Sequence, residues 1–375
     1  MKEIKMVDLN GQYEKIKNEV DDAIHRVLNS GTFIKGPEVK TFENALASFL
    51  GVKRVISCAN GTDALQIAMM ALELRPGDEI ITTPFTFVAT VEVIKLLGLK
   101  PVFVDIEPGS FNIDITKIEA KITPKTKAVV PVHLFGQCAN MESLSVLAKK
   151  HSLFIIEDAA QSLGSNFLFS DGSVKKSGTM GDIGCTSFFP SKNLGTYGDG
   201  GALFTDDPVL AHKLQAIVNH GMIQRYHYDY VGVNSRLDTL QAAILNVKLK
   251  YLDDYNRSRQ VSAGFYDYSL GELNGIKIPA RVGYSTHIFH QYTIRVGNGK
   301  RDALKSHLEK SSVPAMIYYP LSLHLQKAYS DLGYKKGDFP VAEKACEEVL
   351  SLPMHTELDA DQLNYITGCV IEFVN

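Results

Sequence analysis

Apolar residues recur at helical spacing early in the chain, and short apolar runs replace them further on. In residues 11–50 the spacing predicts one helix, and the Gly36-Pro37 pair predicts the start of a second. From about residue 55, β-branched runs alternate with helical segments. Strands are predicted at 55–57, 79–81, 101–104, 128–132 and 154–156.

These runs alternate little between apolar and polar positions, which is typical of strands covered on both faces. Such strands belong to parallel sheets with helices on each side. Helices are predicted between them at 64–72, 88–97 and 141–150. We therefore predict an α/β fold.

A long helical stretch from 236 to about 255 leads into a different pattern. The later elements are a strand at 290–296, a helix at 302–309 and a last helix from about 359. With 375 residues the chain is long enough for two domains. We predict a large domain at 1–250, which includes the N-terminal helices, and a small α+β domain at 251–375.

The overall charge is small, which limits the partners that the chain can attract. The formal net charge is −3, with 45% hydrophobic and 22% charged residues. This balance gives no long-range attraction for nucleic acid or for an anionic membrane, so any anion must be bound by a local site. No apolar run is long enough to cross a bilayer.

The five cysteines argue against a disulfide framework and against a zinc site. They are odd in number and widely spaced, and no two form a Cys-x-x-Cys pair. This usage fits a reducing compartment. The first five residues lead into a mixed charged segment without the apolar core of a signal peptide. We therefore expect a cytoplasmic protein without a metal centre.

Lys192 is the leading candidate for chemistry. It ends the run Ser187-Phe188-Phe189-Pro190-Ser191-Lys192 and is soon followed by the glycine-rich segment 198–201. Burial among such residues disfavours the ammonium form and lowers the pKa. The resulting free amine can attack a carbonyl and form a Schiff base. The alternative is an ordinary solvated lysine in a turn.

Two motifs follow predicted strands and suit a charged ligand. Asn60-Gly61-Thr62 joins a strand end to a helix start, where free N–H groups and the helix dipole favour a phosphate. Asn60 or Thr62 could instead simply cap the helix. Asp158 ends a strand at the sheet edge where α/β proteins bind ligands, and could keep a ring nitrogen protonated. Its alternative role is a helix cap.

Two further residues have weaker support. Phe87 follows another strand and could stack on a planar cofactor, although packing in the core is the common fate of phenylalanine. Asn234 opens the long helical stretch and offers an amide there, or serves as its N-cap.

Together these motifs resemble the DegT-type nucleotide-sugar aminotransferases, which are fold type I pyridoxal phosphate enzymes. The resemblance spans nearly the whole chain, from Ile34-Lys35-Gly36-Pro37 to Ser351-Leu352-Pro353-Met354-His355. The runs that carry it are Glu157-Asp158-Ala159-Ala160-Gln161, Ser187 to Lys192 and Gly198-Asp199-Gly200-Gly201. It implies a mostly parallel seven-stranded sheet in the large domain and pyridoxal 5'-phosphate as the cofactor.

The resemblance also implies roles for the central residues. Lys192 is expected to form the Schiff base with the cofactor, Asp158 to pair with the pyridinium nitrogen, and Gln161 to contact the phenolic oxygen. Relatives that dehydrate sugars carry histidine at the position of Lys192. The lysine therefore favours transamination over dehydration.

The remaining cofactor contacts follow from the same resemblance. Gly61, Thr62 and Ser187 are expected to hold the phosphate, and Phe87 to stack on the ring. In the family, the residue matching Asn234 reaches the phosphate of the neighbouring subunit. This implies a homodimer with shared active sites.

The implied reaction is transfer of an amino group from L-glutamate to a nucleotide-linked keto sugar. The segments 57–66 and 232–244 resemble the aminotransferases of 3-keto sugars. The predicted substrate is UDP-2-acetamido-2-deoxy-3-oxo-glucuronate, an intermediate of diamino-uronic sugars in the O-antigen of lipopolysaccharide. A dTDP-3-keto-6-deoxyhexose or a 4-keto nucleotide sugar is the alternative.

Candidate sugar contacts lie outside the cofactor motifs. Arg225, Tyr226 and His227 occupy the place where the family contacts nucleotide-sugar phosphates, and arginine suits a pyrophosphate or a uronate carboxylate. A surface arginine in a loop is the alternative. Tyr318 is expected to face the sugar, but many relatives have histidine there. Gln224 stands where the uronate enzymes tend to carry another arginine, so both departures leave the sugar open.

Two other classes of function compete with this prediction. A regulatory or sensor protein on the same fold should lack a competent lysine and acid pair, whereas this chain has Lys192 and Asp158. An amino acid decarboxylase or a cysteine desulfurase should carry an arginine for the substrate α-carboxylate and a different surround of the lysine. The sugar aminotransferase therefore remains the prediction.

Overall fold

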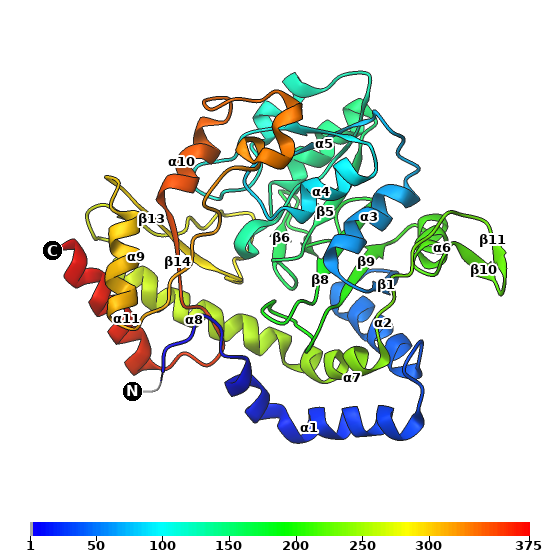
Figure 1. Cartoon of the computed structure of the whole chain (residues 1–375), viewed down its shortest axis with the longest axis horizontal. Helices are drawn as coiled ribbons and strands as arrows, with labels where there is room; N and C mark the ends of the chain where they lie inside the picture. Colours follow the sequence, from blue (N-terminus) through cyan, green and yellow to red (C-terminus); the bar gives the residue numbers. More distant parts are fainter. Residues whose placement is uncertain (1–2) are drawn as a thin grey trace.

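A large sheet covered by helices forms the centre of the molecule (Figure 1). The computed structural model describes residues 3–375. Within these residues the sheet has seven strands in the order β1-β9-β8-β5-β4-β2-β3. Their bounds are Arg54–Cys58 for β1, Glu79–Thr82 for β2, Lys100–Phe103 for β3, Thr126–Val129 for β4, Phe154–Asp158 for β5, Ile183–Ser187 for β8 and Gly201–Thr205 for β9.

The sheet is mostly parallel, which confirms the prediction. Only β9 runs against its neighbours β1 and β8, and the other neighbouring pairs are parallel. The five predicted strands correspond to β1 to β5. The fourth of them ends at Val129 instead of residue 132, shortly before Pro131, which has no N–H to donate to a ladder.

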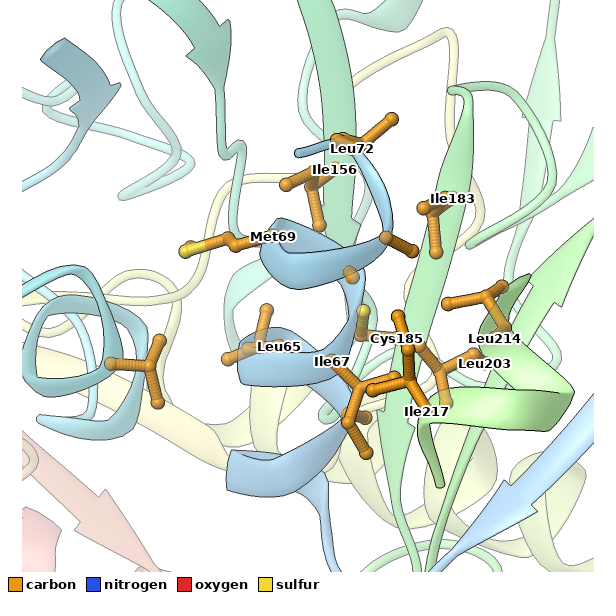
Figure 2. Packing of buried hydrophobic residues seen from close by; sticks show 14 of the residues in the cluster. Leu65, Ile67, Met69, Leu72, Ile156, Ile183, Cys185, Leu203, Leu214 and Ile217 are labelled. Carbon is orange, nitrogen blue, oxygen red and sulfur yellow. The ribbon is translucent and has the colours of Figure 1, made fainter. Parts of the chain in front are cut away.

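Helix α3 (Gly61–Ala71) is held against the sheet by its apolar face. Leu65 and Ile67 of α3 lie with Ile156 of β5, Cys185 of β8 and neighbouring side chains in one buried cluster (Figure 2). Each such side chain contributes roughly 1.5–3 kcal/mol through burial. This packing fixes the start of α3 next to the carboxyl ends of β5 and β8.

The other helices of this region cover the sheet or lie beside α7. Their bounds are Leu9–Ser30 for α1, Pro37–Leu50 for α2, Ala89–Leu96 for α4, Met141–His151 for α5, Pro208–Ile217 for α6 and Thr239–Lys248 for α7. Two short hairpins, β6 (Asn166–Leu168) with β7 (Val174–Lys176) and β10 (Met222–Gln224) with β11 (His227–Tyr228), complete it. The β10–β11 hairpin projects beyond α6 at the edge of the molecule (Figure 1).

The prediction of one helix from 236 to about 255 is wrong. The helix α7 begins at Thr239, because Asp238 has extended backbone, and it ends at Lys248. A 3-10 turn at Leu249–Tyr251 then separates it from α8 (Leu252–Leu270). The apolar face of α7 packs against α1 in a cluster that includes Val20 and Ile244.

The remaining elements lie in residues 252–375, which we call the C-terminal unit. Its elements are α8, β12 (Ile276–Lys277), β13 (Tyr292–Val296), α9 (Arg301–Lys310), α10 (Pro340–Glu348), β14 (Val349–Leu352) and α11 (Ala360–Val374). The three strands form an antiparallel sheet whose core also takes up Ile4 from the start of the chain. Ile4 accordingly packs in the same core as the last helix, α11.

The proposed domain boundary at residue 250 stays a prediction. The core around β13 and β14 belongs to the C-terminal unit, apart from Ile4. However, Phe85 and Phe103 share another buried cluster with Leu323 and Phe339.

None of the helices in residues 3–375 combines the length and apolar character that a membrane span requires.

Candidate active site

A cavity of about 620 Å³ lies where several strands of the large sheet end. Eight of the predicted site residues line it: Gly61, Thr62, Phe87, Asp158, Gln161, Ser187, Lys192 and Tyr318. The loops after β2, β4, β5 and β8 all contribute, as expected when the carboxyl ends of parallel strands meet at one edge. Asn234, Arg225, Tyr226 and His227 do not line it.

Lys192 lies in the loop after β8 and lines the cavity. Its enclosure by protein lowers the pKa of Lys192 to about 8, while the negative charge of Asp158 acts in the opposite direction. Relative to an ordinary lysine, this increases the free-amine fraction at neutral pH by roughly 300-fold. The expectation of a partly buried, activated amine agrees with this environment.

Glycines bring the Lys192 loop against the start of α3. The first residue of β9 is Gly201, and a Cβ built there would lie 2.4 Å from the carbonyl carbon of Asn60. Any other residue would push the two segments apart. The loop is closed by Thr196, whose Oγ1 donates to the carbonyl oxygen of Phe188 at 2.7 Å.

The first turn of α3 forms a cradle with Ser187. Asn60 caps the helix, since its side chain accepts a hydrogen bond from the N–H of Asp63 at 2.8 Å. Gly61 and Thr62 line the cavity, and their N–H groups precede the first intrahelical bond. A Cβ at Gly61 would lie 2.6 Å from Cβ of Ser187, so only glycine permits this approach. Asn60 therefore caps the helix while Gly61 and Thr62 remain available to a ligand in the cavity.

Asp158 is buried at the end of β5, and each of its two carboxylate oxygens accepts one hydrogen bond. Oδ2 accepts from Thr90 Oγ1 at 2.8 Å, and Oδ1 accepts from the N–H of Ala160 at 3.2 Å. The residues that follow form a turn, so the alternative of a helix cap is wrong. The carboxylate lines the cavity that also contains Lys192.

Gln161 has a defined amide orientation. Its Oε1 accepts from the N–H of Phe135 at 2.8 Å, and its Nε2 donates to the hydroxyl of Tyr319 at 3.1 Å. An amide nitrogen carries two hydrogens, so one remains for an acceptor in the cavity. This geometry suits an oxygen atom of a bound ligand.

Phe87 is not a core residue. It is 54% exposed and lines the cavity, whereas Phe85, two positions earlier, is 1% exposed and packs in the core. Phe87 thus offers an uncovered aromatic face next to the charged groups.

Sequence reasoning missed three residues that the C-terminal unit brings to the cavity: His290, Gln291 and Tyr319. His290 is buried, and its Nδ1 has no hydrogen-bond partner. Burial, with the charges of Lys192 and Arg259, lowers the pKa of His290 well below its usual value. The strand predicted at 290–296 starts at Tyr292 instead. No local pattern in the sequence marks the two residues before it as part of a binding site.

The remaining candidates lie on the surface of the chain. Asn234 is exposed and forms an isolated bridge with Asn219, so its alternative role as the N-cap of α7 is wrong. Arg225, Tyr226 and His227 lie on the exposed β10–β11 hairpin. The guanidinium of Arg225 lies 5.1 Å from the centre of the Tyr226 ring.

The residues of the cavity fit pyridoxal phosphate. Lys192 would supply the amine for its aldehyde, the first turn of α3 would supply N–H groups for its phosphate, and Asp158 would supply a charge for its ring nitrogen. Across residues 3–375, no group of three or more His, Cys, Asp or Glu side chains is arranged to hold a metal ion.

Comparisons with known proteins cover nearly the whole chain. The family model described as the DegT/DnrJ/EryC1/StrS aminotransferase family matches residues 14–371. A "Pleiotropic regulatory protein" of Geobacillus stearothermophilus is 46% identical over 372 residues, which are 99% of this chain and 98% of that protein. The UDP-2-acetamido-2-deoxy-3-oxo-D-glucuronate aminotransferase of Pseudomonas aeruginosa is 47% identical over 367 residues, or 98% of this chain and 99% of that protein.

A solved structure agrees with the whole fold. DesV of S. venezuelae, crystallised in complex with a ketimine intermediate, is 37% identical. It superposes with a TM-score of 0.96 and covers 100% of this chain and 99% of its own.

Proposed function

Because the chain belongs to the DegT/DnrJ/EryC1/StrS aminotransferase family and is a pyridoxal phosphate enzyme, we propose that it aminates C3 of a nucleotide-linked 3-keto sugar with L-glutamate as the donor. The proposed substrate is UDP-2-acetamido-2-deoxy-3-oxo-glucuronate, and the product serves the synthesis of lipopolysaccharide O-antigen or a related glycan. The proposal rests above all on the convergence of Lys192, Asp158 and the first turn of α3 on one cavity.

Lys192 has two tasks in this proposal. Pyridoxal phosphate supplies an aldehyde that binds amines and a ring that accepts the electrons released at the adjacent carbon. Nζ of Lys192 is the protein's attachment point for that aldehyde. With the cofactor held, the free amine of Lys192 would move the proton that leaves the donor carbon and the proton that reaches the sugar carbon. Because its pKa is about 8, both protonation states are accessible near neutral pH.

The other cavity residues hold and polarise the cofactor. Asp158 pairs with the ring nitrogen and keeps it protonated, and Gln161 donates its free amide hydrogen to the phenolic oxygen. Gly61, Thr62 and Ser187 hold the phosphate at the start of α3. Phe87 stacks on the ring, for which its exposed face is suited.

We propose that the active enzyme is a homodimer with shared sites. Asn234 and the β10–β11 hairpin would then reach the cavity of the partner, because they lie outside the cavity of their own chain. The hairpin and the residues that follow it expose the apolar side chains of Tyr226, Tyr228 and Val231. Exposed apolar side chains of this kind suit an interface.

The identity of the sugar is the least constrained part of the proposal. Arg225 suits a pyrophosphate or a uronate carboxylate, with Tyr226 and His227 beside it. Tyr318 lines the cavity and offers only a neutral hydroxyl. A dTDP-3-keto-6-deoxyhexose is the second candidate because Tyr318 does not require a carboxylate, and a 4-keto nucleotide sugar is the third.

One similar protein is described as regulatory, but a role without turnover is not proposed for this chain. A protein that only senses its ligand does not need an activated lysine and a buried acid in the same cavity. This chain has both, in Lys192 and Asp158.

The test follows the amino group through each half of the reaction. Purified protein with bound pyridoxal phosphate is mixed with glutamate, and we expect its cofactor absorbance to bleach while 2-oxoglutarate appears. Lys192→Ala is the control and should not turn over. Protein that does not bleach contradicts glutamate as the donor.

The aminated enzyme is then offered the three candidate sugars separately, and the mass of each product is measured. We expect kcat/KM for the 3-oxo-glucuronate to exceed the others by about tenfold or more, the size of effect that one charged contact gives. A preference for the dTDP sugar or for a 4-keto sugar contradicts the uronate and selects that alternative.

A further inference from the structure

Two buried ionisable groups have no part in the chemistry described above. His133 and Glu157 both have fully buried side chains, and Nε2 of His133 lies 2.8 Å from Oε2 of Glu157. Glu157 precedes Asp158 in β5, so its side chain points to the opposite face of the sheet. The pair therefore lies behind the active site.

The carboxylate of Glu157 accepts four hydrogen bonds. Besides His133, the donors are the backbone N–H groups of Gly178 at 2.9 Å, Met180 at 2.5 Å and Gly181 at 2.5 Å. All four partners donate, so an ionised carboxylate satisfies them and an amide would not. A glutamine here would direct its NH₂ group at donors and leave polar groups unpaired.

The tautomer of His133 follows from its other contact. The N–H of Ala139 donates to Nδ1 of His133 at 3.1 Å, so Nδ1 carries no proton. The ring proton of the neutral imidazole is therefore on Nε2 and is donated to Glu157. His133 thus ties the segment 133–139 to the back of β5.

The same segment orients Gln161. The backbone N–H of His133 donates to the carbonyl oxygen of Asp158 at 3.0 Å. Two residues later, the N–H of Phe135 donates to Oε1 of Gln161 at 2.8 Å. Phe135 has φ 57°, a left-handed conformation that is unfavourable for a residue other than glycine. This conformation persists only if the segment is held on both sides.

We propose that the His133–Glu157 pair is a positioning device for Gln161. By anchoring the segment 133–139, it fixes the N–H of Phe135 and so the direction of the Gln161 amide. The remaining amide hydrogen then points at the phenolic oxygen of the cofactor. This inference rests on the proposed function, because it requires that role of Gln161.

The test measures how the absorbance of bound pyridoxal phosphate changes with pH. A donor at the phenolic oxygen stabilises the negative charge of that oxygen. It thereby favours loss of the proton from the nitrogen that joins Lys192 to the cofactor. Loss of that donor in Gln161→Leu should raise the midpoint of the absorbance change by about one pH unit. His133→Leu should raise it by a similar amount, and the double variant should give no further shift.

Conservative variants separate positioning from folding. His133→Gln keeps a donor and an acceptor and should give less than half of the shift. His133→Asn, which keeps the contact with Ala139 and drops the one with Glu157, replaces His133→Leu if that variant does not fold. Tyr292→Phe is the matched control, since it removes a partly buried hydrogen bond of 2.8 Å to Asp267 in the C-terminal unit. It should lower stability without moving the midpoint.

Each outcome decides one of the two proposals. If Gln161→Leu leaves the midpoint unchanged, the role of Gln161 is wrong and the positioning device falls with it. If Gln161→Leu shifts the midpoint but the His133 variants do not, only the positioning device is wrong. Shifts that add in the double variant, or a shift in Tyr292→Phe, also overturn the positioning device.

Discussion

Replacement of Lys192 by methionine tests whether the cavity destabilises the ammonium form of this lysine. Methionine has a similar length and no charge, so the variant keeps most of the packing and removes the titration. The experiment uses protein freed of cofactor, in which Lys192 titrates as a simple amine. Its pKa in the folded protein is about 8, compared with 10.5 for an ordinary lysine.

The sign of the effect follows from proton binding. The unfolded chain holds this proton more tightly, so between pH 8 and 10.5 the unfolded state carries more protons and stability rises with pH. Below pH 8 the lysine is charged in both states, and the folded protein carries the full free-energy cost of enclosing the ammonium group. The difference between 10.5 and about 8 corresponds to about 3 kcal/mol. This is an upper limit, because water in the cavity screens part of the charge.

Urea unfolding at fixed protein concentration measures the difference between Lys192→Met and the unaltered protein. We expect the variant to be more stable by up to about 3 kcal/mol at pH 7, and this advantage to fall by about half or more at pH 9.5. Lys149→Met is the control, since Lys149 is exposed in the last turn of α5 and should show no such trend. An advantage that stays constant from pH 7 to 9.5 would refute the lowered pKa.

Three further predictions concern the cofactor site and the dimer. Gly61→Ala should weaken pyridoxal phosphate binding about tenfold or more in a titration, because its Cβ would lie 2.6 Å from that of Ser187 and push α3 away; unchanged affinity would remove this contact from the cradle. Asp158→Asn should lower kcat by about 100-fold while the cofactor stays bound, since the amide cannot stabilise a protonated ring nitrogen; equal rates would exclude Asp158 from catalysis. Mixing subunits of Lys192→Ala with subunits of Asn234→Ala should restore about a quarter of the normal activity, because one site in each mixed dimer is then intact; mixtures without regained activity contradict shared sites.

Much of the large sheet could be predicted because its signals are local. The strands β1 to β5 are short apolar runs, and α3, α4 and α5 are periodic segments between them, so their neighbours in sequence suffice to identify them. Parallel strands place their carboxyl ends at one edge. Asp158 and Gly61 therefore converge with Lys192 even though up to 131 positions of the sequence separate them.

Other features had no local signal. The helical spacing continues through 236–255, but the chain breaks it into α7 and α8 with a 3-10 turn, and Asn234 lies outside both helices. Apolar periodicity reports which face is buried and does not report a change of helix type. Whether Asn60 or Asp158 caps a helix likewise depends on whether a helix follows it. A helix follows Asn60, whereas a turn follows Asp158.

The sequence by itself determined the fold class and made Lys192 the candidate amine, because these follow from apolar runs and from residue types next to strand ends and glycines, whereas the cofactor chemistry was implied by the resemblance to a known family. Only the tertiary structure decided that His290, Gln291 and Tyr319 line the same cavity and that His133 and Glu157 lie behind Gln161. These residues come from distant segments whose contacts depend on how the C-terminal unit and the loops pack against the sheet. Close packing of that kind leaves no pattern within any single stretch of sequence.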